Sequence, residues 1–275
     1  MRTQRIYTRN ADYQKFEVLK TNRNKRYRYR QFFVEGVRNI NTAIQNGWPV
    51  DAFLYSFESR LSDWATKLLQ TVPTQVNYEL TAELMAEVSG KTDQSEICAI
   101  IRMRDDRTDN LLLGGNPLLV LFDRPSNKGN LGTIIRSCDA LGVAAMVMTG
   151  HAVDRYDPET LAASMGSFFK LPVIHLPDNE AVQAWITSLR QAWPGLRVIG
   201  TSAHADRDIE AVDLTGPSLL IIGNETEGMS NFCYAACDEL GRIPMAPDSS
   251  ASSFNVACAA TVILYEAVRQ RRHRG

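Results

Sequence analysis

The chain has 275 residues, of which 44% are hydrophobic and 22% charged, a soluble globular composition with room for one large or two modest domains. Its formal net charge of −1 argues against a uniformly basic nucleic-acid binder. Because the sequence has neither an apolar N-terminal segment nor a run long enough to span a membrane, we expect neither secretion nor a membrane location.

In chain order, the first hundred residues alternate between helical and strand-like patterns. Residues 13–29 predict a helix followed by a basic loop, and residues 32–47 predict a strand leading into a helix. Strands are further predicted at 52–57, 76–80 and 97–103, with helices at 61–70 and from 81 onward. This alternation predicts a compact α/β sandwich. The polar segment that follows, with Gly114 and Gly115 near its end, is typical of a linker.

The N-terminal segment is also where positive charge concentrates. Residues 1–40 contain eleven Lys or Arg and three acidic residues, which leaves about nine excess negative charges on the remaining chain. Lys25, Arg26, Arg28 and Arg30 alternate with tyrosines, and cations mixed with aromatic rings suit phosphates and unstacked bases. We predict that these four cations bind RNA; the alternative is a solvated arm or helix face. Residues 271–274 form a second basic patch, which could instead complement a helix dipole.

Strand and helix patterns alternate almost without interruption after the linker. Strands are predicted at 118–122, 144–149, 172–176, 197–203, 218–223 and 242–245. Helices are predicted from the loop at 127–133 onward and at 158–166, 179–193, 231–240 and 254–271. Such alternation favours a mostly parallel sheet with helices on both faces.

Three of these strands run into polar loops of unusual composition. The first loop contains Asn127, Gly129 and Asn130, with Arg136 just inside the following helix, and free N–H groups at such a helix start attract anions. The second places Glu225 beside Asn224, and the third is a Ser-rich segment that ends in a helix. Gly and Asn are also ordinary loop residues, so the first loop alone does not establish a site.

Together the three stretches are similar to a known family. NKGNLGTIIRSCDALG at 127–142, IIGNETEGMS at 221–230 and IPMAPDSSASSFNVACAATVILYEAVRQR at 243–271 resemble the three ordered motifs of the TrmH/SpoU RNA ribose 2′-O-methyltransferases, in the SPOUT superfamily. SMGSFFKLPV at 164–173 is also similar. The departures are Lys128, Thr226 and Phe254, where proline, glycine and leucine are more usual; Thr226 leaves the course of the second loop open.

The resemblance implies a fold and a cofactor. It implies a C-terminal SPOUT domain at 117–275 with a deep trefoil knot, a linker at 107–116, and a small N-terminal α/β RNA-binding domain at 1–106 that resembles a ribosomal protein. It further implies that the knot binds S-adenosyl-L-methionine, largely through backbone groups. The implied cofactor-binding residues are Thr201, Gly223, Ile243, Met245 and Phe254.

The resemblance also implies the reaction, which is transfer of a methyl group from S-adenosyl-L-methionine to a ribose 2′-hydroxyl in RNA. The catalytic residues that it implies are Arg136, Asn130, Glu225, Ser253 and Asn255. Because a guanidinium scarcely deprotonates, we expect Arg136 to hold the target phosphate, not to act as the base. Glu225 would accept the proton or orient Asn130 and Arg136. Structural alternatives remain: Glu225 could cap the following helix, and Ser253 and Asn255 could cap the last helix.

Several partners and compartments follow as expectations. A homodimer is implied by the resemblance, and the apolar stripe Val256, Ala259, Ala260, Ile263, Leu264, Ala267 and Val268 would serve it, although core packing explains the stripe equally well. Ribosomal RNA is favoured as substrate over transfer RNA, with a non-catalytic RNA-binding or ribosome-assembly protein as the alternative class. A dinucleotide-dependent dehydrogenase is disfavoured as the function, because the sequence has no GxGxxG loop between a predicted strand and a predicted helix.

Five cysteines without a CxxC pair favour the cytoplasm, and four scattered histidines predict no metal.

Overall fold

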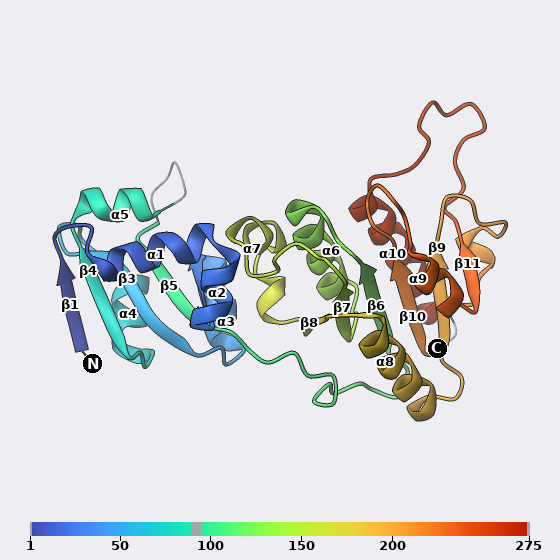
Figure 1. Ribbon diagram of the computed structural model, residues 1–275, viewed down its shortest axis with the longest axis horizontal. Helices are drawn as coiled ribbons and strands as arrows, with labels where there is room; N and C mark the ends of the chain where they lie inside the picture. Colours follow the sequence, from blue (N-terminus) through green and yellow to red (C-terminus); the bar gives the residue numbers. More distant parts are fainter. Residues whose placement is uncertain (1, 90–94, 274–275) are drawn as a thin grey trace. The chain divides into compact units, whose positions relative to one another are not determined.

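The computed structural model describes residues 2–89 and 95–273, and the chain divides into two compact units (Figure 1). The first unit comprises Met1–Asp105 and Asp154–Lys170, and the second comprises Asp106–Val153 and Leu171–Gly275. The boundaries predicted at 106 and 117 stay a prediction; the compact units differ from them in assigning Asp154–Lys170 to the first unit.

The first unit contains a five-stranded mixed sheet in the order β1-β4-β3-β5-β2. Its strands are β1 (Arg2–Ile6), β2 (Gln31–Glu35), β3 (Val50–Ser56), β4 (Val76–Leu80) and β5 (Ile97–Arg102). Its helices are α1 (Ala11–Thr21), α2 (Arg23–Tyr29), α3 (Val37–Gln45), α4 (Asp63–Thr71), α5 (Ala82–Val88), α7 (Pro158–Ser164) and the 3₁₀ turn η1 (Ser167–Phe169). A core of apolar side chains from α1 and α5 fills one face of the sheet.

Two features of this unit correct the sequence prediction. Strand β1 was not predicted, and it pairs in parallel with β4 at the edge of the sheet. The basic run is helical, whereas a loop was predicted: Asn22 ends α1 and its side chain accepts a hydrogen bond from the Lys25 N–H, which caps α2. Successive side chains of α2 therefore project about 100° apart around the helix axis, so its cations do not all face the same side.

An aromatic cluster explains why Asp154–Lys170 belongs to the first unit. Phe168 and Phe169 of η1 pack with Phe32 and Trp48, and all four rings are buried. The Trp48 indole Nε1 donates a 2.8 Å hydrogen bond to the carbonyl oxygen of Phe169. The motif at 164–173 thus supplies core residues to the first unit, although it lies in the sequence between two strands of the second.

The second unit contains a six-stranded sheet in the order β11-β9-β10-β6-β7-β8, and all its pairings are parallel. Its strands are β6 (Leu118–Asp123), β7 (Ala145–Thr149), β8 (Val173–Leu176), β9 (Arg197–Thr201), β10 (Ser218–Ile222) and β11 (Glu239–Gly241). Its helices are α6 (Lys128–Ala140), α8 (Asn179–Ala192), the 3₁₀ turn η2 (Ile209–Ala211), α9 (Asn231–Ala236) and α10 (Val256–His273). This confirms the predicted mixed α/β fold with a mostly parallel sheet.

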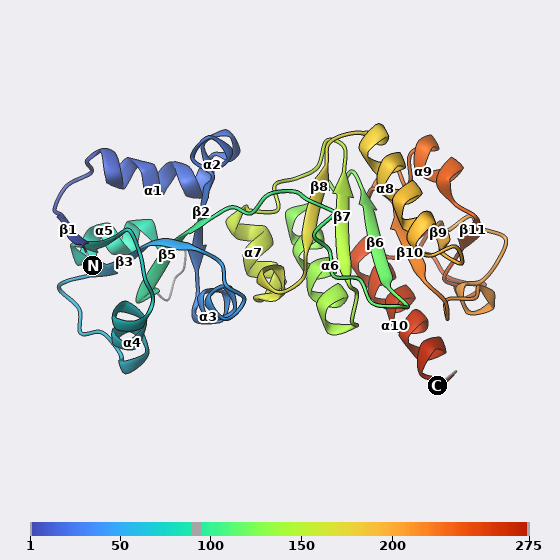
Figure 2. The ribbon, with the colours of Figure 1, turned by 90° about the horizontal axis from the view of Figure 1, so that it is seen from below.

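Helices cover both faces of this sheet. Figure 2 shows α8 and α9 on one face, and α6 and α10 side by side on the other. The Ser137 and Thr261 hydroxyls form a 2.6 Å hydrogen bond between α6 and α10. The linker predicted at 107–116 contains neither helix nor strand and belongs to the second unit. Just before it, the Asp106 carboxylate accepts a 2.9 Å hydrogen bond from the His175 N–H of the same unit.

The C-terminal elements differ in detail from the prediction. The last strand lies at 239–241, not at 242–245, because its parallel partner β9 ends at Thr201 and the ladder ends with it. On α10 the apolar stripe is mainly core: Ala260, Ile263, Leu264 and Ala267 are buried. The exposed apolar side chains of this region, Phe254, Val262 and Tyr265, lie outside that stripe.

Candidate active site

The site lies where neighbouring parallel strands end. Strands β11, β9, β10 and β6 are adjacent and parallel, so their carboxyl ends share one edge of the sheet. In open α/β sheets, ligands bind outside these ends. The three polar loops predicted from the sequence all follow such strands, and the N-terminus of α10 completes the group.

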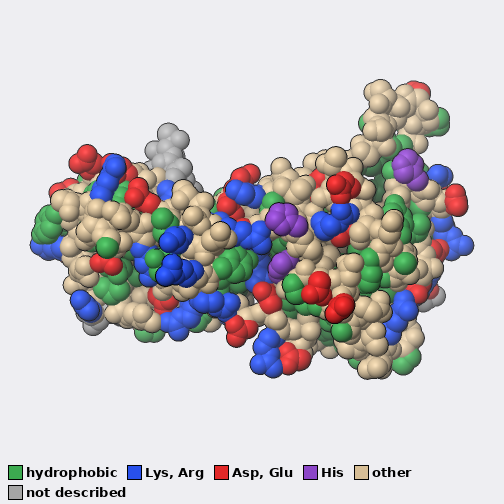
Figure 3. Space-filling model, in the orientation of Figure 1, with side chains coloured by type: hydrophobic (Ala, Val, Ile, Leu, Met, Phe, Trp, Pro, Cys, Tyr) green, Lys and Arg blue, Asp and Glu red, His purple; other side chains and the backbone are tan. Residues whose placement is uncertain are grey.

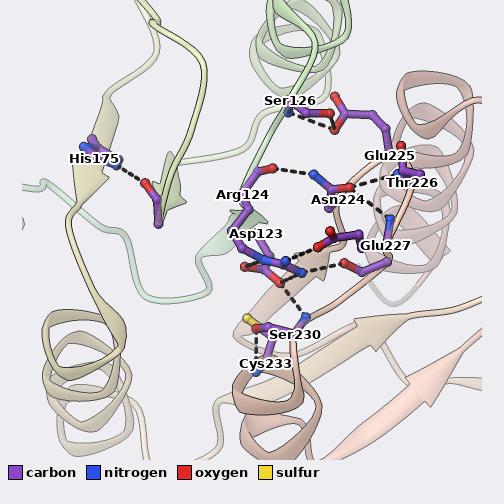
Figure 4. A network of polar contacts seen from close by, with 12 residues as sticks. Asp123, Arg124, Ser126, His175, Asn224, Glu225, Thr226, Glu227, Ser230 and Cys233 are labelled. Carbon is purple, nitrogen blue, oxygen red and sulfur yellow. Dashed lines mark hydrogen bonds and ion pairs between the residues drawn. The ribbon is translucent and has the colours of Figure 1, made fainter.

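Glu225 is the polar centre of the site and ties the second loop to the first (Figure 4). Its carboxylate accepts hydrogen bonds from the Ser126 N–H at 2.9 Å, the Ser126 hydroxyl at 2.7 Å and the Asn127 N–H at 3.0 Å. The Asn130 side-chain amide lies 3.5 Å away. Glu225 therefore binds the start of α6, whereas Ser230 caps α9, the helix that Glu225 was thought able to cap.

These contacts define the ionisation of Glu225. Partial burial raises its pKa, but the hydrogen bonds from Ser126 and Asn127 outweigh burial, so the pKa of Glu225 lies below its ordinary value. An ionised carboxylate that already accepts several hydrogen bonds is a weak proton acceptor. The geometry therefore favours the orienting role of Glu225 over the role of base.

Asn255 connects the third loop to the same cluster. Its side-chain amide donates a 3.2 Å hydrogen bond to Asn130 Oδ1, while its own Oδ1 accepts 2.9 Å and 3.4 Å hydrogen bonds from the N–H groups of Ala257 and Cys258. Asn255 is thus both the cap of α10 and a neighbour of Asn130. The structure brings together Asn130, Glu225 and Asn255 from three segments of the chain.

Arg136 and Ser253 are placed differently. Both side chains are exposed, and neither forms a hydrogen bond or ion pair with any residue that the structure describes. Arg136 follows Asn130 by six positions on α6, which places it about 9 Å further along the helix axis and on another side of the helix. The Arg136 guanidinium is therefore available to a ligand outside the Asn130 cluster.

A cavity of about 390 Å³ adjoins this cluster, and all five predicted cofactor-binding residues line it. Thr201, Gly223, Ile243, Met245 and Phe254 come from the ends of β9 and β10 and from the chain between β11 and α10. Glu225 and Ser253 also line the cavity, so it meets the polar cluster directly.

The wall of this cavity suits a ligand recognised through backbone groups. Among the described residues, the N–H groups of Ile243, Met245 and Phe254 have no hydrogen-bond partner. Ile243 and Met245 are half-buried and Phe254 is exposed, so these three N–H groups are open to a polar ligand. Ile222, Ala260 and Ile263 add an apolar surface. Apolar walls with open backbone donors fit the adenosine and amino-acid parts of S-adenosylmethionine.

The second loop also accommodates Thr226, which the sequence left open. Its N–H and that of Glu227 donate hydrogen bonds of 2.9 Å and 3.0 Å to Asn224 Oδ1, which forms a tight turn. The left-handed position of the loop belongs to Gly228, with a φ of 70°, and not to Thr226. A side chain at 226 is therefore tolerated.

The RNA-binding prediction is wrong for Arg26. This side chain is 1% exposed, and it forms ion pairs with Asp154 at 2.7 Å and Asp157 at 3.2 Å. Its Nη1 also donates to the carbonyl oxygens of Leu19 and Lys20. Arg26 is therefore a buried structural residue of the first unit, and no surface remains on it for a phosphate.

The other three cations remain accessible. Lys25 is half-buried, while Arg28 and Arg30 are exposed, although Arg30 forms an exposed ion pair with Asp105. Tyr29 is exposed nearby. Figure 3 shows Lys and Arg side chains gathered over the part of the first unit that contains α1 and α2.

The C-terminal basic patch is also partly structural. The Arg271 guanidinium donates hydrogen bonds to the carbonyl oxygens of Leu214, Asn116 and Gly216, and burial lowers its pKa. Arg272 is exposed, and residue 274 lies outside the described residues. Arg271 therefore fastens the end of α10 to the second unit.

Other chemistries find little support in the described residues. The cysteines are all free, and burial raises the pKa of Cys233 to about 11 and of Cys237 to about 12, which keeps these thiols protonated. Within residues 2–89 and 95–273, no three His, Cys, Asp or Glu side chains are grouped to hold a metal ion. In the same residues, no helix is both long and apolar enough to cross a membrane.

Sequence reasoning missed the residues that hold the loops in place. Asp123 ends strand β6 and Arg124 follows it, and Asn224 donates a 2.7 Å hydrogen bond to the Arg124 carbonyl oxygen. Ser126 provides two of the contacts to Glu225. A signal was present, because Asp123 and Arg124 follow an apolar strand directly at the edge where ligands bind.

Known proteins share the sequence motifs and the fold of this chain. Residues 117–265 match the sequence model of the SpoU rRNA Methylase family, and residues 10–99 match that of the SpoU L30e-like domain. A 23S rRNA (uridine(2479)-2′-O)-methyltransferase from Streptomyces viridochromogenes is 45% identical over 97% of this chain and 92% of its own length. The crystal structure of the SpoU methyltransferase AviRb from the same organism, in complex with AdoMet, superposes with a TM-score of 0.91 at 45% identity, covering 96% of this chain and 99% of that chain.

A more distant relative matches a smaller share of the chain. The 23S rRNA (guanosine-2′-O-)-methyltransferase RlmB of Photobacterium profundum is 31% identical over 62% of this chain and 67% of its own length. The motif matches, the superposition and the near full-length similarity confirm the resemblance seen in the sequence. The chain belongs to the SpoU rRNA methylase family.

Proposed function

We propose that this protein transfers a methyl group from S-adenosylmethionine to a ribose 2′-hydroxyl of 23S ribosomal RNA. One observation carries the proposal: Glu225 lines the cavity that the cofactor would occupy and at the same time binds the start of α6, the helix that presents Asn130. A single loop thus joins a cofactor pocket to a polar cluster. Similarity to a 23S rRNA 2′-O-methyltransferase along nearly the whole chain supports the same conclusion.

The bound cofactor supplies a methyl group that its positively charged sulfur already activates. The protein must then orient the ribose hydroxyl and stabilise the charge that develops on its oxygen. Asn130 and Asn255 hold each other in place beside the cavity, so their amides are preorganised for this task. Glu225 fixes Asn130 through the start of α6, and Ser253 adds a hydroxyl to the same cavity wall.

Arg136 acts on the RNA backbone in this proposal. Its guanidinium is exposed and unpaired among the described residues, and a planar fork of donors matches a phosphate. Holding the phosphate next to the target ribose restricts the approach of its 2′-hydroxyl. Arg136 therefore contributes by positioning and charge, and it does not need to lose a proton.

The first unit holds the RNA. Lys25, Arg28 and Arg30 with Tyr29 provide phosphate contacts and a ring on which a base can stack. The target is expected to be a uridine, because the relative that matches almost the whole chain is named for a uridine, whereas the guanosine-specific relative matches 62% of it.

We further propose a homodimer and a trefoil knot in the second unit. Phe254, Val262 and Tyr265 expose apolar surface that a second copy would cover. Light scattering at micromolar concentration should give a dimer for the wild type and a folded monomer for Val262→Glu, whose far-UV circular dichroism matches that of the wild type. Ile263→Glu is the contrast: it should unfold the chain, since Ile263 is buried. A fully active wild-type monomer would contradict the dimer.

The knot concerns the segments that line the cofactor cavity, which the family resemblance places in knotted loops. A crystal structure whose backbone trace contains no knot would contradict it.

A cytoplasmic location fits a ribosomal RNA substrate and the five free cysteines. Cell fractionation tests it, and recovery of the protein outside the cytoplasm would contradict it.

The decisive experiment supplies unmodified 23S rRNA and labelled S-adenosylmethionine to the purified full chain. Mass spectrometry of ribonuclease fragments should locate a single 2′-O-methylated uridine, and Asn130→Ala should abolish the signal. Calorimetry with the cofactor alone is the parallel measurement. Cofactor binding without transfer to any 23S nucleotide would contradict the proposal, and absence of both would favour a non-catalytic RNA-binding protein.

A further inference from the structure

Arg124 has an unusual backbone conformation. Its φ is 49°, in the left-handed region that side chains disfavour. Among the described residues, the other two non-glycine positions with positive φ, Arg30 and Met165, are helix C-caps, where this conformation is common. Arg124 instead follows directly on strand β6, so surrounding contacts must hold it there.

The strained backbone places two main-chain groups. The Arg124 N–H donates a 3.1 Å hydrogen bond to the carbonyl oxygen of Thr149, the last residue of β7, which extends the pairing of β6 with β7 by one residue. The Arg124 carbonyl oxygen turns the other way and accepts a 2.7 Å hydrogen bond from the Asn224 side chain (Figure 4). Asn224 in turn accepts the N–H groups of Thr226 and Glu227. One carbonyl group therefore organises the turn at 224–227.

The side chain grips the other end of the same loop. Its guanidinium lies 3.1 Å from Asp123 Oδ1, donates a 3.1 Å hydrogen bond to the Gly228 carbonyl oxygen and forms an ion pair with Glu227. Asp123 is 2% exposed and also accepts a 2.6 Å hydrogen bond from the Ser230 N–H. The Glu227 side chain, in contrast, is 67% exposed. The Arg124 guanidinium thus contacts one buried carboxylate, that of Asp123, and one exposed carboxylate, that of Glu227.

Space around Arg124 is equally restricted. A Cβ atom at Gly150 would lie 2.8 Å from the Arg124 Cγ, so the side-chain stem packs directly on that glycine. Three acceptors in different directions surround the guanidinium, and a planar fork serves them simultaneously, whereas an ammonium group on a flexible stem does not.

The gripped loop serves both halves of the proposed site. Asn224 to Gly228 all line the cofactor cavity, and Glu225 in their middle binds Ser126, Asn127 and Asn130. We infer that Arg124 is a positioning residue, which fixes the loop at 224–228 for cofactor binding and for the orientation of Asn130. The inference rests on the proposed methyl transfer. It adds a residue that touches neither substrate nor cofactor and acts through this loop.

The test separates positioning from a merely structural role. Arg124→Gly removes the side chain, and glycine adopts the left-handed conformation without strain, so the chain should still fold. Calorimetry should show about tenfold weaker cofactor binding. At saturating cofactor, kcat should fall about 10- to 100-fold, because a displaced Asn130 no longer orients the hydroxyl. The KM for RNA should stay unchanged.

Matched variants sharpen the result. Arg124→Lys should recover part of both losses, and Glu227→Gln should weaken cofactor binding less than about fivefold, because that ion pair is exposed. Arg190→Ala, which removes an exposed ion pair with Asp238 in the same unit, should change neither quantity. If Arg124→Gly does not fold, the Lys variant decides, since it keeps the stem and the charge.

The outcomes distinguish this inference from the function on which it rests. Wild-type protein that binds the cofactor but methylates no 23S rRNA would refute the proposed function, while the cofactor affinities of the variants would still test the grip on the loop. Cofactor affinity and kcat within twofold of wild type in Arg124→Gly would overturn the inference. If that variant does not fold, wild-type values in Arg124→Lys would overturn it equally.

Discussion

Helices α2 and α6 each carry an arginine that was predicted from the sequence to bind RNA, but one of the two side chains is buried and the other is exposed. Arg26 on α2 is 1% exposed and paired with two aspartates, whereas Arg136 on α6 is exposed and has no partner among the described residues. Both helices begin at an asparagine cap. The difference teaches that a dense run of cations does not show which of them reaches the surface.

The cause lies far away in the sequence. Asp154 and Asp157 follow Arg26 by more than 120 positions, and no local pattern predicts that they return to it. Once buried, a guanidinium requires paired charges and hydrogen bonds, and Arg26 has both. Arg136 lies in a motif whose spacing already indicated its place just inside a helix.

The largest expected effect concerns the stability of the first unit. Arg26→Ala should lower the free energy of unfolding by about 3–5 kcal/mol, because it leaves Asp154 and Asp157 buried without their cation. Urea unfolding followed by circular dichroism measures it. Arg28→Ala, two positions along the same helix and exposed, is the matched control and should stay within about 0.5 kcal/mol of wild type. Equal losses in both variants would remove the contrast.

Arg136 should show the reverse pattern. Arg136→Ala and Arg136→Lys should each lower kcat about 100- to 1000-fold, because a group that stabilises developing charge has been lost or has changed shape. Stability and cofactor affinity should remain at wild-type values, since Arg136 is exposed and lies outside the cavity lining. A Lys variant that keeps most of its activity would show that fork geometry is not required.

A smaller effect is expected from the three accessible cations of the predicted RNA-binding run. Replacing Lys25, Arg28 and Arg30 by Ala, with Arg26 left intact, should weaken RNA binding and flatten its salt dependence by about 2 units of log–log slope. Cofactor affinity should not change. Arg60→Ala with Lys67→Ala is the control in the same unit, because both side chains are exposed. A triple variant with the wild-type slope would place the RNA footprint elsewhere.

The smallest expected effect is the contribution of Glu225 to the pH profile. Since the folded-state pKa of Glu225 lies below its ordinary 4.5, its stabilising contacts are fully present above that value and are lost as the pH falls through the folded pKa. Activity should therefore show no acidic limb from Glu225 between about pH 5 and 8. A limb in this range that disappears in Glu225→Gln would show that Glu225 is the base after all.

Much of the candidate site was predictable because its parts are local. Strand β6, the loop at 124–127 and α6 follow one another within about two dozen residues, and apolar periodicity with Gly and Asn marks their order. Asn255 was predicted both as a cap and as a site residue, and it is both a cap and a partner of Asn130. The grip of Arg124 on the loop at 224–228 could not be predicted, because its partners lie about 100 positions away.

The sequence by itself determined the alternation of strands and helices, the parallel sheet, the three loops at its carboxyl edge and the family of the chain, because these depend on periodicity and motifs within short segments. Only the tertiary structure decided that Asp154–Lys170 packs with the first unit, that Arg26 is buried, and that Ile263 belongs to the core. These outcomes depend on contacts between distant segments. Burial and pairing are properties of the folded chain, and a residue's own neighbours in sequence do not specify them.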